Sequence, residues 1–121
     1  MDTTSNSNNN TTSTFSRQRT LPRYNFIAST ELIDMGSATR LSGRVTEISR
    51  NGCYVDSLNA LPVDTVLNLR IERDHGTFAT RGKIIYVHER IGMGVVFLDP
   101  PKDQVEILDS WIIELPSTSA I

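Results

Sequence analysis

The stretch TVLNLRIER, residues 65–73, decides the fold class of this chain. Leu67, Leu69 and Ile71 are separated by single polar residues, which is the period of a strand with one buried face and one solvent face. The next three residues, Asp-His-Gly at 74–76, have the composition of a hairpin turn, in which Gly76 is expected to supply a positive φ. The segment therefore predicts one arm of an antiparallel hairpin.

Five further strand-like segments, separated by polar turns, lie around this stretch. The six expected strands cover residues 25–34, 40–48, 52–57, 65–73, 77–89 and 91–98. In the last of them, Gly92 and Gly94 indicate a bulge or the close approach of another backbone. Six short strands joined by turns predict a mainly β fold, a small antiparallel barrel that is closed or nearly closed.

After residue 99 the apolar period changes to three and four residues, which is typical of an amphipathic helix. Its apolar stripe consists of Val105, Leu108, Trp111, Ile112 and Leu115. Asp99 is expected to cap this helix and Pro116 to end it. Because so short a helix is marginal alone, we expect the stripe to cover an open end or face of the barrel. The alternative is that Trp111 and its neighbours form a dimer interface.

The length of 121 residues allows one domain with a modest core. Residues 1–16 are almost entirely Ser, Thr and Asn, and they cannot bury enough apolar surface to offset the entropy of ordering. We expect a disordered tail over residues 1–16, a domain over residues 17–116 and a short tail over residues 117–121. Residues 17–23 would form a hinge between the first tail and the domain.

The net charge and the single cysteine exclude some classes of protein. The net charge of −2 argues against a general binder of nucleic acid polymers, although ten of the twelve cations are arginine. Arginine suits paired hydrogen bonds to a phosphate or a guanine edge. The single cysteine, Cys53, excludes an internal disulfide and is expected to be a buried, inert thiol. No apolar segment reaches the length of a membrane span and no secretory signal is recognisable, so we expect no membrane insertion and a cytoplasmic protein.

Two groups of polar residues indicate a ligand site. Arg19 and Arg23 stand four residues apart in the hinge, and residues 47–52 form a polar turn between two expected strands. An arginine fork recognises a guanine edge with paired hydrogen bonds that give roughly 1 to 3 kcal/mol of discrimination. Ser49 offers a small hydroxyl, and Gly52 lets a backbone come close. An arginine pair facing a rigid turn can clamp a phosphorylated, guanine-bearing ligand.

With these motifs in this order, the chain resembles the PilZ domain family of bacterial receptors for cyclic di-GMP. That family has an Arg-x-x-x-Arg motif before a six-stranded barrel and an Asp/Asn-x-Ser-x-x-Gly motif after its second strand. The matching segments here are RTLPR at 19–23 and EISRNG at 47–52. Further similarity is seen at residues 52–55, 82–87 and 93–97, and the resemblance covers residues 17 to about 115.

The resemblance implies a six-stranded antiparallel PilZ-type β-barrel with a C-terminal α-helix. It also implies a cyclic di-GMP site at Arg19, Arg23, Glu47, Ser49 and Gly52, with no cofactor other than this ligand. Glu47 stands where the family usually has aspartate or asparagine, and its extra methylene moves the carboxylate outward by roughly 1.5 Å. The implied function is that of a second-messenger sensor for motility or biofilm formation. In it, ligand binding orders the arginine hinge and signals to an unidentified protein partner, and the sensor itself is a monomer or weak dimer.

The alternatives to this function are an adaptor, a nucleic-acid-binding barrel and an enzyme. A nucleotide-independent adaptor of the same fold, acting in pilus assembly or motility by protein contact, is the main alternative. A barrel that binds single-stranded nucleic acid would need a basic groove lined with aromatic side chains. We expect no enzyme, because the chain has no phosphate-binding loop, no nucleophile elbow and no recognisable His–Cys pair. No metal-ligand spacing accompanies His75 or His88.

Overall fold

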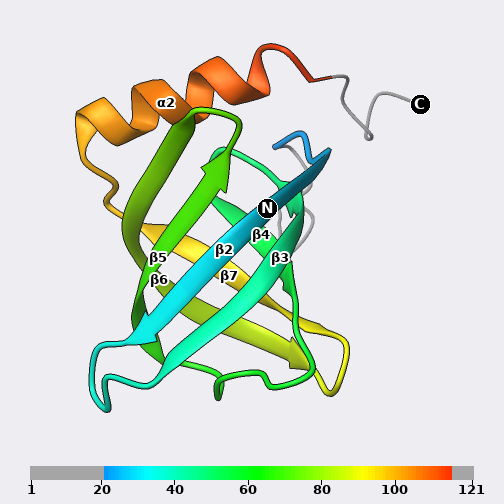
Figure 1. Cartoon of the computed structure of the whole chain (residues 1–121), viewed down its shortest axis with the longest axis vertical. Coiled ribbons are helices and arrows are strands. Elements are labelled where there is room, and N and C mark those ends of the chain that lie inside the picture. Colours follow the sequence, from blue (N-terminus) through cyan, green and yellow to red (C-terminus); the bar gives the residue numbers. More distant parts are fainter. Residues whose placement is uncertain (1–20, 116–121) are drawn as a thin grey trace, which may run out of the picture.

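Six antiparallel strands close into a barrel in the computed structural model, which describes residues 21–115 (Figure 1). The strands are β2 (Tyr24–Asp34), β3 (Arg40–Ile48), β4 (Gly52–Asp56), β5 (Val66–Arg73), β6 (Gly76–His88) and β7 (Gly92–Leu98). Their order is β2-β3-β4-β7-β6-β5, and β5 pairs with β2 to complete the ring. The expected barrel is confirmed, and each strand ends within one residue of its expected bounds. The expected tails at residues 1–16 and 117–121 lie outside the described residues.

The hairpin between β5 and β6 confirms the alternation on which the strand prediction rested. Leu67, Leu69 and Ile71 are buried, and the residues between them are exposed. The positive φ of the turn, however, lies at Asp74 (55°) and not at Gly76 as expected. Gly76 is already paired with the last residue of β5. The short side chain of aspartate tolerates the left-handed conformation that the turn requires.

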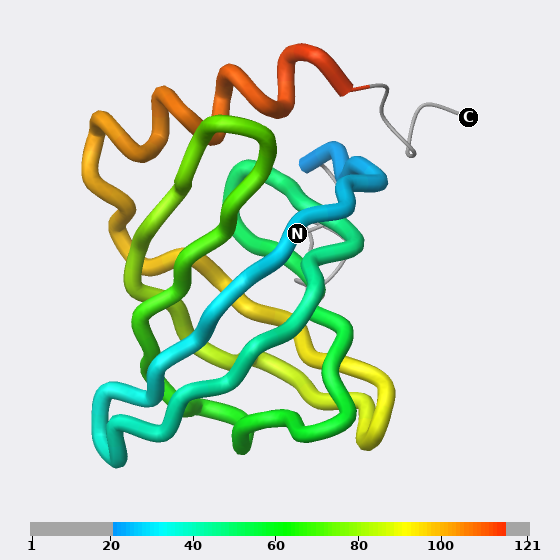
Figure 2. The backbone as a smooth tube through the Cα atoms, viewed as in Figure 1, coloured from blue at the N-terminus to red at the C-terminus, as the bar shows by residue number. Residues whose placement is uncertain are grey.

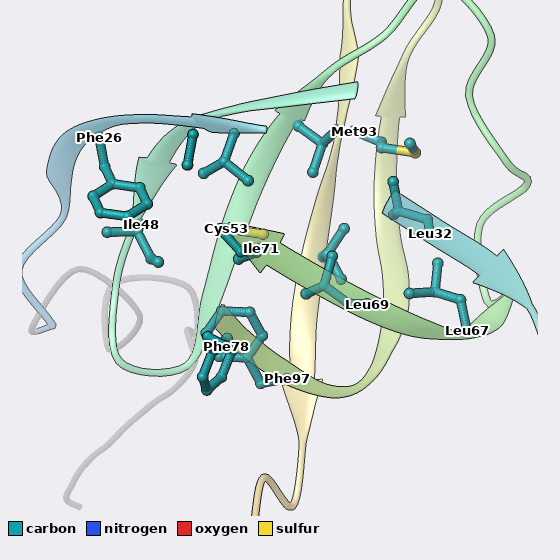
Figure 3. Packing of buried hydrophobic residues seen from close by; sticks show 14 of the residues in the cluster. Phe26, Leu32, Ile48, Cys53, Leu67, Leu69, Ile71, Phe78, Met93 and Phe97 are labelled. Carbon is teal, nitrogen blue, oxygen red and sulfur yellow. The ribbon is translucent and has the colours of Figure 1, made fainter. Parts of the chain in front are cut away.

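Large apolar side chains from every strand fill the interior of the barrel (Figure 3). The most deeply buried of them include Phe26, Leu32, Val45, Ile48, Val55, Leu69, Ile71, Phe78, Ile84 and Met93. Phe78 meets the ring of Phe97 edge to face, with ring centroids 5.0 Å apart. A barrel of this size has room only for its own side chains. A ligand must therefore bind on its outer surface or rim.

Helix α2 (Lys102–Ile112) lies across one end of the barrel, as Figures 1 and 2 show. Leu108 and Ile112 are buried in the same cluster as the barrel interior. The ring of Trp111 lies 5.4 Å from that of Phe26 and 6.5 Å from that of Phe78, measured between centroids. The expected covering of a barrel end is confirmed for Leu108, Trp111, Ile112 and Leu115, which pack in or against the core cluster.

The expected start of α2 is wrong. Asp99 does not cap the helix: the N-cap is Pro101, and it makes no side-chain capping hydrogen bond. The backbone carbonyl of Pro101 accepts the first helical hydrogen bonds, from the N–H groups of Gln104 and Val105. Asp99 lies before this point with a φ of 47°, a backbone conformation that belongs to the preceding turn. At the other end the helix stops at Ile112, and the proline expected to end it lies outside the described residues.

Replacing Trp111 by alanine tests how much the covered end contributes to stability. Trp111→Ala should lower the free energy of unfolding by about 2 kcal/mol or more, because the indole contacts with Phe26 and Phe78 are lost. Urea unfolding followed by circular dichroism measures this. Ile113→Ala is the matched control, since Ile113 is 83% exposed, and its effect should stay within about 0.5 kcal/mol. Equal stability of the two variants would contradict the packing of α2 on the barrel.

Candidate functional site

The register between β2 and β3 brings the two polar motifs together. Across these strands Asn25 pairs with Glu47 and Tyr24 pairs with Ile48. Arg23 immediately precedes β2, so it is carried to the side of the turn that follows β3. There its Nε lies 3.6 Å from Oε1 of Glu47, and the two side chains are 51% and 39% exposed. Arg19, the other expected arginine, lies outside the described residues.

The turn between β3 and β4 is held by its own hydrogen bonds. The N–H of Ser49 donates to the carbonyl of Gly52 (2.9 Å), and its hydroxyl donates to Oδ1 of Asn51 (2.7 Å). The carbonyl of Asn51 accepts from the N–H of Phe97 in β7 (2.8 Å). Ser49 is only 7% exposed, so its hydroxyl serves the turn in this state. A side chain at Gly52 would lie 2.4 Å from the carbonyl oxygen of Val95, so glycine is required by the barrel itself.

The turn is also tied to the helix. Arg50 and Asn51 are both exposed to solvent. The guanidinium of Arg50 makes an ion pair with Asp109 of α2, at 2.9 Å from Oδ1, and donates to Oδ2 at 3.0 Å. The polar turn region therefore contacts both Arg23, through Glu47, and the helix that covers the barrel end, through Arg50.

An open pocket of about 270 Å³ lies beside this turn on the outer surface of the barrel. The expected site residues that line it are Arg23, Glu47, Ser49 and Gly52. The structure thus brings together every expected site residue that it describes. Their role as ligand contacts stays a prediction.

Sequence reasoning missed three further residues that line the pocket, Tyr54, Ile85 and Tyr86, of which Tyr54 pairs with Glu47 across β3 and β4. Ile85 is 47% exposed and Tyr86 is 39% exposed, an unusual exposure for large apolar groups on consecutive strand residues. The signal in the sequence was the run Ile84, Ile85 and Tyr86, which breaks the alternation of a half-buried strand. Burial raises the pKa of the Tyr54 hydroxyl, and the neighbouring Tyr86, Asp56 and Glu47 raise it further.

Two negative findings apply to residues 21–115. No group of three or more histidine, cysteine, aspartate or glutamate side chains in this range is placed to hold a metal ion. No helix in this range is long and apolar enough to cross a membrane.

A model of the PilZ domain family matches residues 17–114. The chain belongs to the PilZ domain family, and the resemblance seen in its motifs is confirmed. This is a family of binding and adaptor domains. Among curated proteins, no relative matches the chain.

Solved structures of PilZ domains have the same fold. The PilZ domain of YcgR from Escherichia coli, solved with c-di-GMP, is 14% identical with a TM-score of 0.66, and the match covers 78% of this chain and 88% of that one. The PilZ domain of CeSA from a cellulose-synthesizing bacterium is 16% identical with a TM-score of 0.59, covering 75% and 94%. The Bacillus subtilis inhibitor of motility MotI/DgrA is 14% identical with a TM-score of 0.65 over 77% of this chain. The match spans only 48% of MotI/DgrA.

The reactivity of the Cys53 thiol tests whether this residue, which lies beside the pocket, is buried. Cys53 is among the residues around the pocket, yet it is buried in the core, and burial raises the pKa of its thiol from 9.0 to about 12. At about pH 8 the folded protein should therefore hold the unreactive thiol form, and Ellman's reagent should label it only after unfolding in urea. A Cys53→Ser variant should give no signal under either condition. Rapid labelling of the folded protein would contradict the described burial.

Proposed function

We propose that this protein binds cyclic di-GMP in the pocket beside the polar turn and acts as a second-messenger sensor. The observation that carries this proposal is the meeting of the two motifs, with Arg23 beside Glu47 at the mouth of one pocket. Membership of the PilZ family supports it. The similar fold of YcgR, a PilZ domain solved with c-di-GMP, supports it as well.

Each expected residue has a distinct part in this proposal. Arg19 and Arg23 bind the phosphates or the guanine edges of the ligand, for which a planar, forked cation is suited. Glu47 accepts hydrogen bonds from guanine N–H groups. Ser49 and Gly52 act chiefly through the turn, because the Ser49 hydroxyl already donates to Asn51 and Gly52 lies against β7. A correctly shaped turn then presents its backbone to the ligand.

The Arg23–Glu47 ion pair opposes binding only weakly. Cyclic di-GMP carries two negative phosphates, so Arg23 must exchange at least part of its contact with Glu47 for the ligand. Both side chains are substantially exposed, and an exposed ion pair contributes about 0.2 to 1 kcal/mol. A good paired contact of arginine with a guanine edge gives roughly 1 to 3 kcal/mol. The exchange therefore favours the ligand if geometry allows a paired contact.

Binding would close residues 19–23 over the ligand and create a new surface for a protein partner. This is a switch that works by ordering a segment, and it needs no attached output domain. The ion pair of Arg50 with Asp109 links the same turn to α2, so the helix is placed to change with the turn.

A second candidate function is a nucleotide-independent PilZ adaptor that acts in pilus assembly or motility through protein contact. The observation in its favour is the glutamate at position 47, which differs from the aspartate or asparagine usual in the family and pairs with Arg23. The two candidates differ in whether the protein binds the nucleotide.

Calorimetric titration of the purified protein with cyclic di-GMP separates these candidates. The sensor should give saturable heat, and GMP should compete poorly. Arg19→Ala and Arg23→Ala should each weaken binding by about 1 kcal/mol or more without a change in thermal stability. Arg81→Ala is the matched control, because Arg81 is an exposed cation of β6 that lies outside the pocket. Absence of heat at high micromolar ligand would favour the adaptor.

The length of the side chain at position 47 is open to a separate test. Glu47→Asp should bind cyclic di-GMP more tightly, because the shorter side chain releases Arg23 for the ligand and still offers a carboxylate to the guanine N–H groups. Glu47→Gln keeps the length and removes the charge, so it separates reach from charge. The measurement is the dissociation constant of each variant by the same titration. Binding by Glu47→Asp that is no tighter than that of the unaltered protein would show that reach does not limit the site.

A further inference from the structure

A second groove crosses the outer face of the barrel, away from the polar turn. It has a volume of about 620 Å³ and runs over β3, β2, β5 and β6 to the connection between β7 and α2. It shares no lining residue with the pocket beside the polar turn. Three arginines line it, Arg40, Arg70 and Arg81, together with two carboxylates, Glu31 and Asp99. This arginine groove has no part in the binding of the nucleotide proposed above.

Strand pairing fixes the positions of the three arginines along the groove. A single row of paired residues crosses the sheet through Arg40, Ile33, Asn68 and Arg81. Arg40 and Arg81 therefore stand three strand spacings apart, which is roughly 14 Å along the sheet. Arg70 lies between them on β5, two residues after Asn68. The three cations are thus spread along the groove.

The three guanidinium groups differ in the partners that they already have. Arg40 makes an ion pair with Glu31 at 2.7 Å, and Arg70 makes one with Glu72 at 3.2 Å. Both pairs are solvent-exposed to a large extent, so they contribute little to stability and can be exchanged. Within residues 21–115 the guanidinium of Arg81 makes no ion pair and no hydrogen bond. The groove therefore offers one open cation and two that can change partners.

The amount of positive charge on this face exceeds what solubility requires. Outward side chains of a strand are usually polar, which explains single charges on the face of a barrel. Strands β5 and β6, however, carry four cations, Arg70, Arg73, Arg81 and Lys83, against one carboxylate, Glu72. The whole chain has a net charge of −2. Positive charge is thus concentrated on the face that holds the groove, and an anionic partner complements it.

We propose that the arginine groove binds an extended acidic segment of a protein partner, with one carboxylate for each arginine. The planar fork of arginine suits a carboxylate, to which it donates two parallel hydrogen bonds. In an extended chain, side chains on the same face recur about every 6.6 Å. Acidic residues at three alternate positions therefore span roughly 13 Å, which matches the roughly 14 Å between Arg40 and Arg81. This proposal rests on the proposed function for the role of a protein partner, but it does not require the nucleotide.

NMR titration of the full chain with short peptides tests this proposal. The probe is a peptide of about seven residues in which glutamate alternates with serine, used at low salt because salt screens exposed charges. It should shift the backbone amide signals around Arg70 and Arg81, and the shifts should saturate. A peptide of the same composition with its glutamates adjacent should bind about threefold more weakly or worse. Equal binding of the two peptides, or shifts centred on the polar turn, would overturn the proposal.

Substitutions separate the groove from the net charge of the protein. Arg70→Ala and Arg81→Ala should each weaken binding of the alternating peptide about threefold or more. Arg44→Ala is the matched control, because Arg44 is an exposed cation of β3 that lines neither the groove nor the pocket. It should bind the peptide like the unaltered protein. A loss as large in Arg44→Ala as in Arg81→Ala would show that only net charge matters and would exclude the groove.

Failure of this proposal and failure of the proposed function give different results. The peptide titration contains no cyclic di-GMP, so binding in the groove supports the partner surface whether or not the nucleotide binds. A protein that binds cyclic di-GMP but not the alternating peptide keeps the sensor function and loses the partner surface. A short oligothymidylate that binds the groove more tightly than the peptide would overturn the choice of a protein as the partner.

Discussion

The register of β2 against its two neighbours is the constraint on which the rest of the structure depends. β2 pairs with β3 on one side and with β5 on the other, which closes the barrel and leaves no open sheet edge. The same register sets Asn25 opposite Glu47 and so carries Arg23 to the polar turn. The closed interior is filled with side chains, and the pocket that the expected site residues line lies on its outer surface, beside the turn to which this register carries Arg23.

The outer pocket is bordered by a weak, exposed ion pair and by a turn whose shape is fixed by hydrogen bonds. The Arg23–Glu47 pair is exposed and contributes little to stability, so it can be exchanged for a ligand at small cost. The turn is different, because Ser49 and Asn51 hold its shape and Phe97 anchors it to β7. The Arg23–Glu47 ion pair is easily exchanged, and it lies beside a turn of fixed shape. The contacts of the pocket can therefore change while the barrel stays the same.

Local signals predicted the elements and the strand bounds well, but not the helix cap or the turn residue with positive φ. The alternation in β5 and the apolar stripe of α2 were correct, because the burial of each element follows from its own period. The cap at Asp99 and the positive φ at Gly76 were wrong. Both depend on where a turn ends and pairing begins, which is decided by neighbours far along the chain. Asp74 took the strained position because Gly76 was already paired in β6.

The strands, the helix and the two motifs were readable from residue order, because each is a property of a short segment and its periodicity. Their meeting was expected from the resemblance to the family, but the contact between Arg23 and Glu47 is set by the pairing of β2 with β3. The outward orientation of Tyr86 beside the pocket was not predicted. It needs a bulge at Ile85 and a glycine in β7 beneath the ring of Tyr86. Such contacts join residues that are distant in the chain, so only the closed barrel decides them.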